Sequence, residues 1–400
     1  MTRFVPTSID ELREAIASAL AADEPVELIA GGTKRGLGRP LQTPHVVDLT
    51  RLSGIRDYAP NELVLTAGAA TPLSAIDRAL AASGQMLAFE PPDWRDLLSQ
   101  VHGSQTLGGV IACNLSGPRR IKAGAARDHF LGFYAVSGRA EIFKAGGKVV
   151  KNVTGYDLPK LIAGSYGTLA VLEEVTVKVL PKPETAATVV VGGVAPEEAV
   201  MLMSAALGSP HEVSGAAYLP SGTPRRASLA ATGVVMLRVE GPAPSVAYRR
   251  EALLREHAAS GEAAVLGDAE TAALWRDIGN VAPLAGFADR AVWRISVAPG
   301  RGAAVAQAVA RAVDAVWFLD WGGGLIWMAV IEPGDAGAAV IRGAIGGAGH
   351  ATLIRGAPGL RAAVPVFEPQ PPPLAALSRR VKEGFDPRHI LNPGRMVEGI

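Results

Sequence analysis

The stretch from Lys148 to Leu180, KVVKNVTGYDLPKLIAGSYGTLAVLEEVTVKVL, restricts the fold more than any other part of the chain. It predicts a short basic strand, a turn at 154–155, a brief helix, a second turn over 164–168 and a closing strand in which valines alternate with polar residues. Turns rich in glycine expose backbone N–H groups and let a ligand approach the main chain closely. The stretch therefore predicts a tight-turned α+β segment that could hold an anion or a nucleotide.

A second glycine-rich loop, AGGTKRGLG over 30–38, directly follows a predicted strand at 25–30. Its glycines favour a nest of backbone N–H groups around a phosphate, and Lys34 and Arg35 would add positive charge. The loop matches neither the Walker motif nor G-x-G-x-x-G. From the residues alone, a surface turn with a solvated lysine and arginine is the alternative.

Composition narrows the class of protein. The 400 residues carry 39 basic and 38 acidic side chains, so the net charge of +1 implies no polyanionic partner, and 48% hydrophobic content is enough for two or three domains. The N-terminus lacks the apolar core of a signal peptide, and the longest uncharged run, 99–118, is too polar to span a bilayer. The single cysteine, Cys113, excludes an internal disulfide and a cysteine-ligated cluster. We expect a cytoplasmic protein, with peripheral membrane association left open.

Local signals place further elements. Ser8 and Glu11 match a helix capping box, and a helix is expected to begin at Thr71-Pro72, with Thr71 as N-cap, and to stop at Gly84. Helices and apolar strands alternate in the second half, which predicts an α+β unit with one sheet. The tryptophans at 275, 293, 317 and 321 are expected in its core. The predicted helices are 196–207, 244–260, 268–279 and 303–316, and the predicted strands are 234–239, 291–297 and 325–331.

Several motifs together resemble the FAD-binding domain of the vanillyl-alcohol-oxidase/PCMH flavoproteins. They are the loop at 31–38, TLGGVIACN over 106–114, RDHFLG over 127–132, and KN-x-x-GYDL with GS-x-GTL inside the stretch described first. The resemblance implies an α+β protein with a two-part PCMH-type FAD-binding domain over 1–184. An α+β cap domain would cover 185–367. A proline-rich linker and a C-terminal helix over 368–400 would return to the FAD side.

The resemblance also implies which residues hold FAD. Because the first loop contains no histidine for a covalent bond, FAD is expected to be bound non-covalently. Asn114 could instead be a turn former and Asp128 a helix or turn cap, and Cys113 is expected to be a small buried residue rather than a nucleophile. The implied cofactor-binding residues are Gly31, Gly32, Thr33, Lys34, Arg35, Gly36, Thr106, Gly108, Gly109, Asn114, Asp128, Gly155, Tyr156, Gly164, Gly167, Thr168 and Asn392.

The C-terminal sequence FDPRHILNPGR, over 385–395, resembles the signature of the 2-hydroxyacid-dehydrogenase branch of these flavoproteins. In that branch it returns to the flavin, so the resemblance implies that Asn392 lies nearest the ring with Arg395 behind it. Read locally, the same residues are a helix followed by an Asn-Pro turn.

Two motifs of the catalytic members of that branch are missing. The seven histidines include no pair at metal-ligand spacing, so no metal is expected, and no Glu-His-Gly supplies a base, since VFEPQP at 366–371 stands in its place. The pattern resembles FAD-binding subunits of multi-subunit 2-hydroxyacid oxidases such as glycolate oxidase. This resemblance implies a catalytic FAD subunit and an iron–sulfur subunit as partners, and leaves the catalytic residues unknown. An autonomous FAD-dependent 2-hydroxyacid dehydrogenase and a flavin-free structural subunit are the alternatives.

Overall fold

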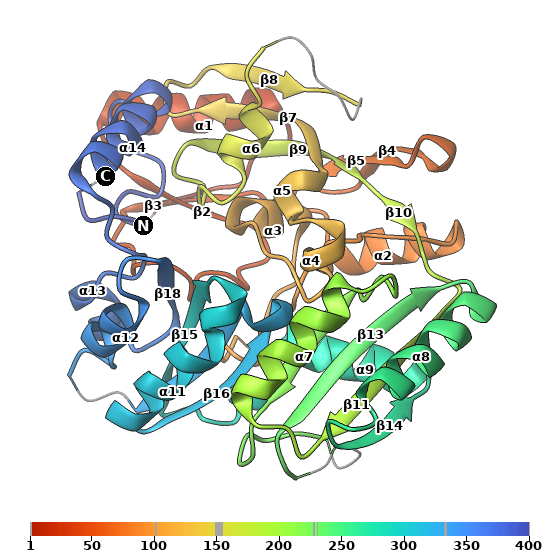
Figure 1. The fold of residues 1–400 in the computed structure, drawn as a ribbon. Coiled ribbons are helices and arrows are strands. Elements are labelled where there is room, and N and C mark those ends of the chain that lie inside the picture. The colour runs from red at the N-terminus through yellow and green to blue at the C-terminus, as the bar shows by residue number, and fades with distance from the viewer. Residues whose placement is uncertain are drawn as a thin grey trace.

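The computed structural model describes residues 2–100, 102–148, 155–226, 229, 231–331 and 334–399. In Figure 1 the N-terminal half occupies the upper part of the molecule together with the C-terminal helix, and residues from about 185 to 365 form the lower part. The basic strand predicted at the start of the stretch from 148, and Thr154 in its first turn, lie outside the described residues.

In the described part of the N-terminal half, the strands form three small sheets. The first is parallel in the order β1-β3-β2, the second is antiparallel in the order β4-β5-β9-β7-β8, and the third is the pair β10-β6. Their strands are β1 (Thr2–Phe4), β2 (Val26–Ile29), β3 (His45–Asp48), β4 (Ile55–Ala59), β5 (Val64–Gly68), β6 (Gln85–Met86), β7 (Phe130–Ser137), β8 (Ile142–Gly146), β9 (Ala170–Lys178) and β10 (Leu180–Pro181). The helices are α1 (Ile9–Ala22), η1 (Pro60–Glu62), α2 (Leu73–Ala82), α3 (Leu107–Cys113), α4 (Arg120–Ala123), α5 (Ala126–His129) and α6 (Leu158–Ile162).

Helix caps follow the sequence closely at α1 and differ by one residue at α2. The Ser8 hydroxyl accepts a hydrogen bond from the Glu11 N–H, which is one half of the predicted capping box, but the Glu11 carboxylate accepts from the N–H and hydroxyl of Thr7 instead of from Ser8. The prediction that Thr71 caps α2 is wrong, because Pro72 is the N-cap. The Thr71 hydroxyl instead donates to the Gly68 carbonyl and accepts from the Gly54 N–H, so it fixes the turn that leads into the helix.

One antiparallel sheet of eight strands organises the second half, which confirms the predicted α+β class. Its order is β14-β11-β13-β12-β16-β17-β15-β18. The strands are β11 (Thr185–Gly192), β12 (Gly215–Leu219), β13 (Val234–Gly241), β14 (Glu262–Leu266), β15 (Arg290–Val297), β16 (Ala315–Asp320), β17 (Leu325–Ile331) and β18 (Gly349–Arg355). The helices are α7 (Pro196–Gly208), α8 (Ala243–His257), α9 (Asp268–Gly279), α10 (Ala282–Ala285), η2 (Pro299–Arg301), α11 (Gly302–Ala312), η3 (Trp321–Gly323), α12 (Ala338–Ile345) and α13 (Pro358–Ala363).

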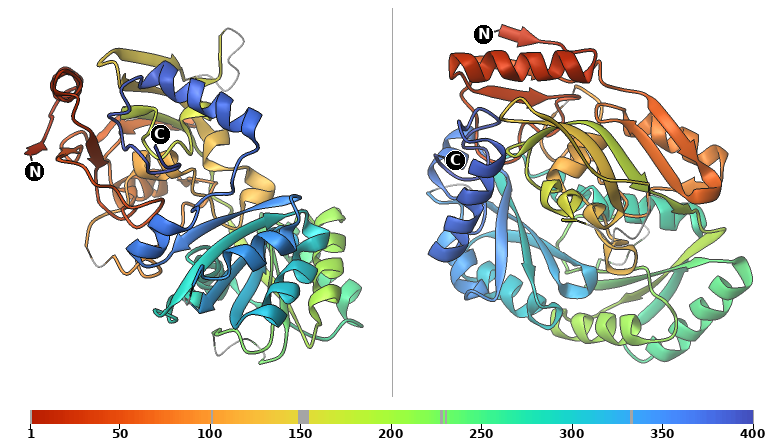
Figure 2. Two further views of the ribbon diagram at one scale, coloured as in Figure 1. Left: turned by 90° about the vertical axis from the view of Figure 1, so that its left-hand side faces the viewer. Right: turned by 90° about the horizontal axis from the view of Figure 1, so that it is seen from above.

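The two faces of this sheet belong to different cores. Helices α7, α8, α11 and α12 cover the outer face, where Trp293 and Met328 are buried. The inner face packs on the N-terminal half, and Trp327 there meets Trp94 edge-on at 5.3 Å between ring centroids. Figure 2 shows the helices on the side of the sheet turned away from the upper part of the molecule. All four tryptophans expected in the core, at 275, 293, 317 and 321, are buried.

Charged residues join the two halves around Glu90. Its carboxylate accepts two hydrogen bonds from the buried Arg238 guanidinium, at 2.7 and 3.0 Å, and one from the Arg119 N–H at 2.6 Å. Arg119 in turn pairs with Glu240 through two hydrogen bonds. Burial alone would raise the pKa of Glu240, but the two arginines lower it to about 2. The halves are therefore held by a network in which each charge is matched.

The C-terminal segment crosses back to the N-terminal half, as Figure 1 shows for the last helix, α14 (Pro372–Phe385). Leu391 forms a parallel bridge with Val26 in β2. The buried Lys382 ammonium donates to Asp386 and to the carbonyls of Thr168 and Leu391. This return is what the resemblance implied for residues after 368. The proposed domain limits at 184 and 367 stay predictions.

We expect Glu90→Gln to reduce the free energy of unfolding by roughly 3 kcal/mol, because it removes one of the two carboxylates that match the buried Arg119 and Arg238 guanidinium groups. Glu262→Gln, at an exposed glutamate of β14, should change it by less than about 0.5 kcal/mol. Urea unfolding of the two variants compares them. Equal stabilities would contradict the view that this ion pair holds the halves together.

Candidate functional site

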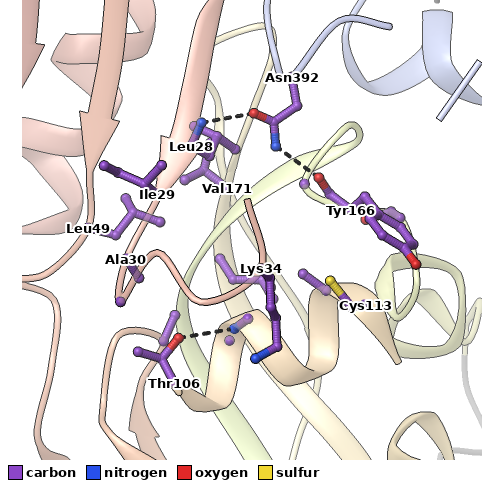
Figure 3. A pocket seen from close by; sticks show the side chains of 18 of the residues that line it. Leu28, Ile29, Ala30, Lys34, Leu49, Thr106, Cys113, Tyr166, Val171 and Asn392 are labelled. Carbon is purple, nitrogen blue, oxygen red and sulfur yellow. Dashed lines mark hydrogen bonds between the residues drawn. The ribbon is translucent and has the colours of Figure 1, made fainter. Parts of the chain in front are cut away.

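A pocket opens between the β2-β3 sheet, strand β9 and helix α3, and Figure 3 shows it from close by. Backbone and small side chains form much of its wall, while the C-terminal segment closes one end. Its lining residues are Leu28, Ile29, Ala30, Gly31, Gly32, Thr33, Lys34, Arg35, Leu49, Ala69, Thr106, Gly108, Gly109, Ala112, Cys113, Ile162, Ser165, Tyr166, Gly167, Ala170, Val171, Leu172, Asn392 and Arg395.

The first glycine-rich loop forms one side of the pocket with residues 31–35. A Cβ on Gly31 would lie 1.7 Å from the Ser104 carbonyl oxygen, so only glycine allows this close approach of two backbones. Gly32 has a φ of +74°, and the space around its missing Cβ is open. The loop thus lines the pocket with main chain that carries no side chain at Gly31 and Gly32, and the nest around a phosphate stays a prediction.

Lys34 reaches into the pocket, and the partners of its ammonium among the described residues are neutral. Its ammonium donates to the Gln105 side-chain oxygen at 3.1 Å and to the Thr33 hydroxyl at 3.3 Å. Burial lowers the pKa of Lys34 to about 8, with smaller opposing effects from Cys113 and Asp93. The alternative of a solvated lysine is therefore wrong, because this ammonium is desolvated without a bound carboxylate. Such a group favours an anion in the pocket.

Arg35 differs from Lys34, because its guanidinium is already paired. It donates to both oxygens of the buried Glu27 carboxylate, at 2.9 and 2.6 Å, and half of its side chain is exposed. Arg395 also donates to Glu27, at 3.2 Å, and to the carbonyls of Arg35, Leu37 and Arg39. Arg395 therefore braces the loop from behind, and the two arginines share the single Glu27 carboxylate.

Helix α3 lies beneath the pocket, and its sequence explains how closely it packs. Thr106 caps it by accepting a hydrogen bond from the Gly109 N–H at 3.3 Å. A Cβ on Gly108 would lie 2.7 Å from that of Ala69, so glycine lets the helix rest on the preceding turn. Cys113 is half-buried at the pocket wall, and burial raises the pKa of its thiol to about 11. The thiol is therefore protonated at neutral pH, in keeping with the expectation that it is no nucleophile.

The second glycine turn docks on the end of α3 and is held by Asn392. The Tyr166 N–H donates to the Ala112 carbonyl at 2.8 Å. The Asn392 side chain accepts from the Leu28 N–H at 2.9 Å and donates to the Tyr166 carbonyl at 2.8 Å, as Figure 3 shows. One buried amide therefore joins β2 to this turn across the end of the pocket. A Cβ on Gly167 would lie 2.8 Å from the Asn392 amide nitrogen.

These features fit the FAD that the resemblance implies. The Ser165 hydroxyl lies at the pocket, buried and without a hydrogen-bond partner among the described residues, so it can serve a polar ligand. Lys34 and the bare backbone of the first loop suit a pyrophosphate. Apolar side chains of β2, β3 and β9 suit the flat rings of a dinucleotide.

Ten of the seventeen implied cofactor-binding residues line the pocket together, and seven do not. The ten are Gly31, Gly32, Thr33, Lys34, Arg35, Thr106, Gly108, Gly109, Gly167 and Asn392. The seven are Gly36, Asn114, Asp128, Gly155, Tyr156, Gly164 and Thr168. For these seven, contact with the cofactor stays a prediction.

Several of the seven have structural roles in the described residues. Asn114 ends α3 in the left-handed conformation and accepts from the Arg127 N–H, and Asp128 caps α5 by accepting from the Ala125 N–H. Both match the alternatives that their sequence left open. The Thr168 hydroxyl closes the turn by donating to the Ser165 carbonyl, and Tyr156 is 90% exposed.

Sequence reasoning missed two kinds of pocket residue. Ser165 and Tyr166 stand inside the quoted GS-x-GTL motif, and the neighbouring glycines could have drawn attention to them. The apolar wall, including Leu28, Leu49 and Val171, has no signal beyond that of ordinary strand residues. In the part of the chain that the structure describes, no three His, Cys, Asp or Glu side chains form a possible metal site. No described helix is long and apolar enough to cross a bilayer.

Comparison with known proteins adds a family to this geometry. Residues 3–146 match a family described as an FAD binding domain. The chain is 32% identical over 386 residues to glycolate oxidase subunit GlcE of Escherichia coli K12, covering 96% of both chains. It is 42% identical over 100 residues to glycolate oxidase subunit GlcD of Bacillus subtilis, which covers 25% of this chain and 20% of that one. The fold resembles p-cresol methylhydroxylase with a TM-score of 0.70 at 14% identity, over 99% of this chain and 88% of that one.

We predict that replacing Lys34 with Met stabilises the ligand-free protein near neutral pH. A lysine whose folded pKa is near 8 binds fewer protons than in the unfolded chain between about pH 8 and 10.5, so its contribution to stability rises with pH across that window. Below pH 8 the unfavourable cost is fully present, at about 1.4 kcal/mol for each pKa unit. Denaturant unfolding from pH 7 to 10.5 measures the difference between the two proteins.

The advantage of Lys34→Met over the wild type should shrink as the pH rises through this window. Because the comparison is a difference, other groups that titrate there cancel. Parallel stability curves for the two proteins would contradict a desolvated, unpaired Lys34.

Proposed function

The chain belongs to the family of glycolate oxidase subunit GlcE, FAD-linked oxidoreductases with a PCMH-type fold, and we propose that it is the FAD-binding subunit of a glycolate oxidase complex. In this proposal the complex oxidises glycolate to glyoxylate, with a catalytic FAD subunit and an iron–sulfur subunit as partners. The observation that carries it is the match to GlcE along nearly the whole chain, which coincides with a pocket whose donors and walls suit FAD. We also propose that the FAD is held non-covalently and that the complex works in the cytoplasm, where it could associate peripherally with the membrane.

FAD, when bound, supplies hydride acceptance and electron transfer. The residues of this chain bind and orient it. Lys34 and the backbone at 31–32 would hold the pyrophosphate, and the Lys34 ammonium would offset part of its charge. Because burial lowers the pKa of Lys34, a bound anion would raise that pKa again and favour the charged form. Apolar side chains of β2 and β9 would exclude water from the rings. Asn392 would keep the two sides of the pocket at a fixed separation.

The oxidation of a 2-hydroxy acid needs more than an electron acceptor. The hydroxyl proton must leave as the C–H bond breaks, and a positioned base contributes about 10²–10⁴-fold to such a step. This sequence contains neither the Glu-His-Gly base nor the paired metal histidines of the catalytic members of the branch. We therefore assign the chemical step to the catalytic partner and the holding of a second FAD to this chain.

We expect Gly32→Asp to reduce bound FAD at least tenfold. The new side chain would project into open space at the pocket and set a negative charge against the pyrophosphate, while the left-handed φ costs about 1 kcal/mol of stability. Gly84→Asp is the matched control, because it adds the same charge at another glycine that has a left-handed φ, +62°, and open space around its missing Cβ, but that lies outside the pocket. FAD in the supernatant of acid-precipitated protein gives the FAD content.

Wild type and Gly84→Asp should each release about one FAD per chain. Yellow colour that stays with the precipitate would overturn the non-covalent proposal. Equal FAD content in all three proteins would mean that the loop is an ordinary surface turn, and an absence of FAD from all of them would favour a flavin-free structural subunit.

The isolated chain, loaded with FAD, should oxidise glycolate at least about 100-fold more slowly than the complex with its partners, because the base and the metal ligands are missing. Dye reduction by glycolate, with and without co-expressed partner subunits, measures this. Activity should return with the catalytic partner and vanish when the base of that partner is mutated. Rapid bleaching of the flavin of the isolated chain by glycolate would instead establish an autonomous dehydrogenase.

A further inference from the structure

Two arginines stack on one tryptophan where the halves of the molecule meet. The Arg120 guanidinium carbon, from α4, lies 4.4 Å from the Trp321 ring centroid, and that of Arg294, from β15, lies 5.0 Å from it. The Trp321 indole is fixed by its hydrogen bond to the Gly117 carbonyl at 3.2 Å. Three segments far apart in sequence therefore bring two positive charges to the same aromatic ring.

Neither charge is neutralised. Among the residues that the structure describes, no carboxylate lies within ion-pair distance of Arg120 or Arg294, and neither guanidinium has a hydrogen-bond partner. Burial and, to a smaller extent, the charge of Arg120 lower the pKa of Arg294 to about 10. Asp320 is the carboxylate whose charge favours Arg294, but burial raises the pKa of Asp320 to about 7, so at neutral pH it is only partly ionised.

This arrangement contrasts with the other arginines at the same interface. Arg119 and Arg238 are matched by Glu90 and Glu240. Two adjacent, partly buried cations repel each other, and stacking on an aromatic ring returns only about 0.5–2 kcal/mol. A pair of unmatched charges that persists in a folded protein points to a ligand of opposite charge.

The pair is reachable and lies beside the pocket. Arg120 and Arg294 are both partly exposed, and none of their nitrogens is among the fully enclosed side-chain atoms that lack a partner. Arg294 is close enough to Tyr166 for its charge to act on the phenol, and Tyr166 lines the pocket. A ligand on the guanidinium groups would therefore be a neighbour of whatever fills the pocket.

We infer that Arg120 and Arg294, held by Trp321, form a binding site for a small carboxylate anion next to the pocket. Guanidinium groups present planar pairs of donors that match a carboxylate, and stacking on an indole fixes their orientation. The inference deepens the proposed function, because a subunit of a complex acting on a 2-hydroxy acid would then bind such an acid, or its product, without transforming it. The site itself depends only on the arginine pair.

The test is titration of the FAD-loaded chain with glycolate and acetate, followed by thermal unfolding and by isothermal calorimetry. Both carboxylates should raise the Tm of the wild type, and neutral ethylene glycol should not. Arg294→Gln and Arg120→Gln should each raise the Kd for glycolate at least about tenfold. Arg290→Gln, on the same strand but paired with Asp314, is the matched control and should keep the wild-type Kd.

A second readout separates a ligand site from a structural role. Without carboxylate, Arg294→Gln should have a Tm no lower than that of Arg290→Gln, because it relieves repulsion instead of breaking an ion pair. A large loss of Tm in carboxylate-free buffer would overturn the inference.

Other results would also overturn it. An equal Tm response to sulfate and glycolate would indicate a general ionic effect, and loss of FAD from Arg294→Gln would assign the arginine to the flavin. If the purified chain binds no FAD, the proposed function is refuted but the carboxylate site is not. The calorimetric titration can be run on the flavin-free chain, and it still decides whether that site exists.

Discussion

The pocket depends on two side chains that arrive from the far end of the sequence. Asn392 joins the backbone of β2 to the turn at 164–168, and Arg395 binds two carbonyls of the first glycine-rich loop and that of Arg39 directly after it. Loops rich in glycine lose much entropy on folding, so they hold one shape only when other groups fix them. A buried amide and a buried guanidinium do this from behind, which leaves the front of each loop free for a ligand. The buried Lys382–Asp386 pair anchors the same segment to the turn through the Thr168 carbonyl.

The charged side chains fall into two groups: arginines that pair with carboxylates and hold segments together, and cations without such a partner, which we assign to ligand binding. Around Glu27 and around Glu90, each arginine meets a carboxylate, and these networks join segments that are distant in sequence. Among the residues that the structure describes, Lys34 and the pair Arg120 and Arg294 have no such match. Desolvated charges without partners destabilise a protein that binds nothing. Their positions, at the pocket and beside it, are where anionic ligands would offset that cost.

The sequence was most informative where backbone chemistry dictates the residue. Positions 31 and 108 must be glycine, because a Cβ there would lie 1.7 Å from the Ser104 carbonyl oxygen and 2.8 Å from the Ala69 carbonyl oxygen. Such steric requirements fix the residue type and so give motifs that can be recognised in the sequence. The sequence could not show that Lys34 is desolvated while its neighbour Arg35 is paired with Glu27, because that depends on how the loop folds against β2. The apolar wall of the pocket could not be predicted either, because its residues are of the same types as those in any buried strand. The cluster at Trp321 joins three separate segments, so no local pattern could predict it.

A crystal structure of the chain purified with its flavin tests the central claim most directly. If the chain is an FAD-binding subunit, density for FAD should fill the pocket between β2, β9 and α3, with the pyrophosphate in contact with the Lys34 ammonium and the backbone at 31–32. Density for FAD elsewhere in the molecule, or a pocket without FAD in protein saturated with the cofactor, would contradict the account.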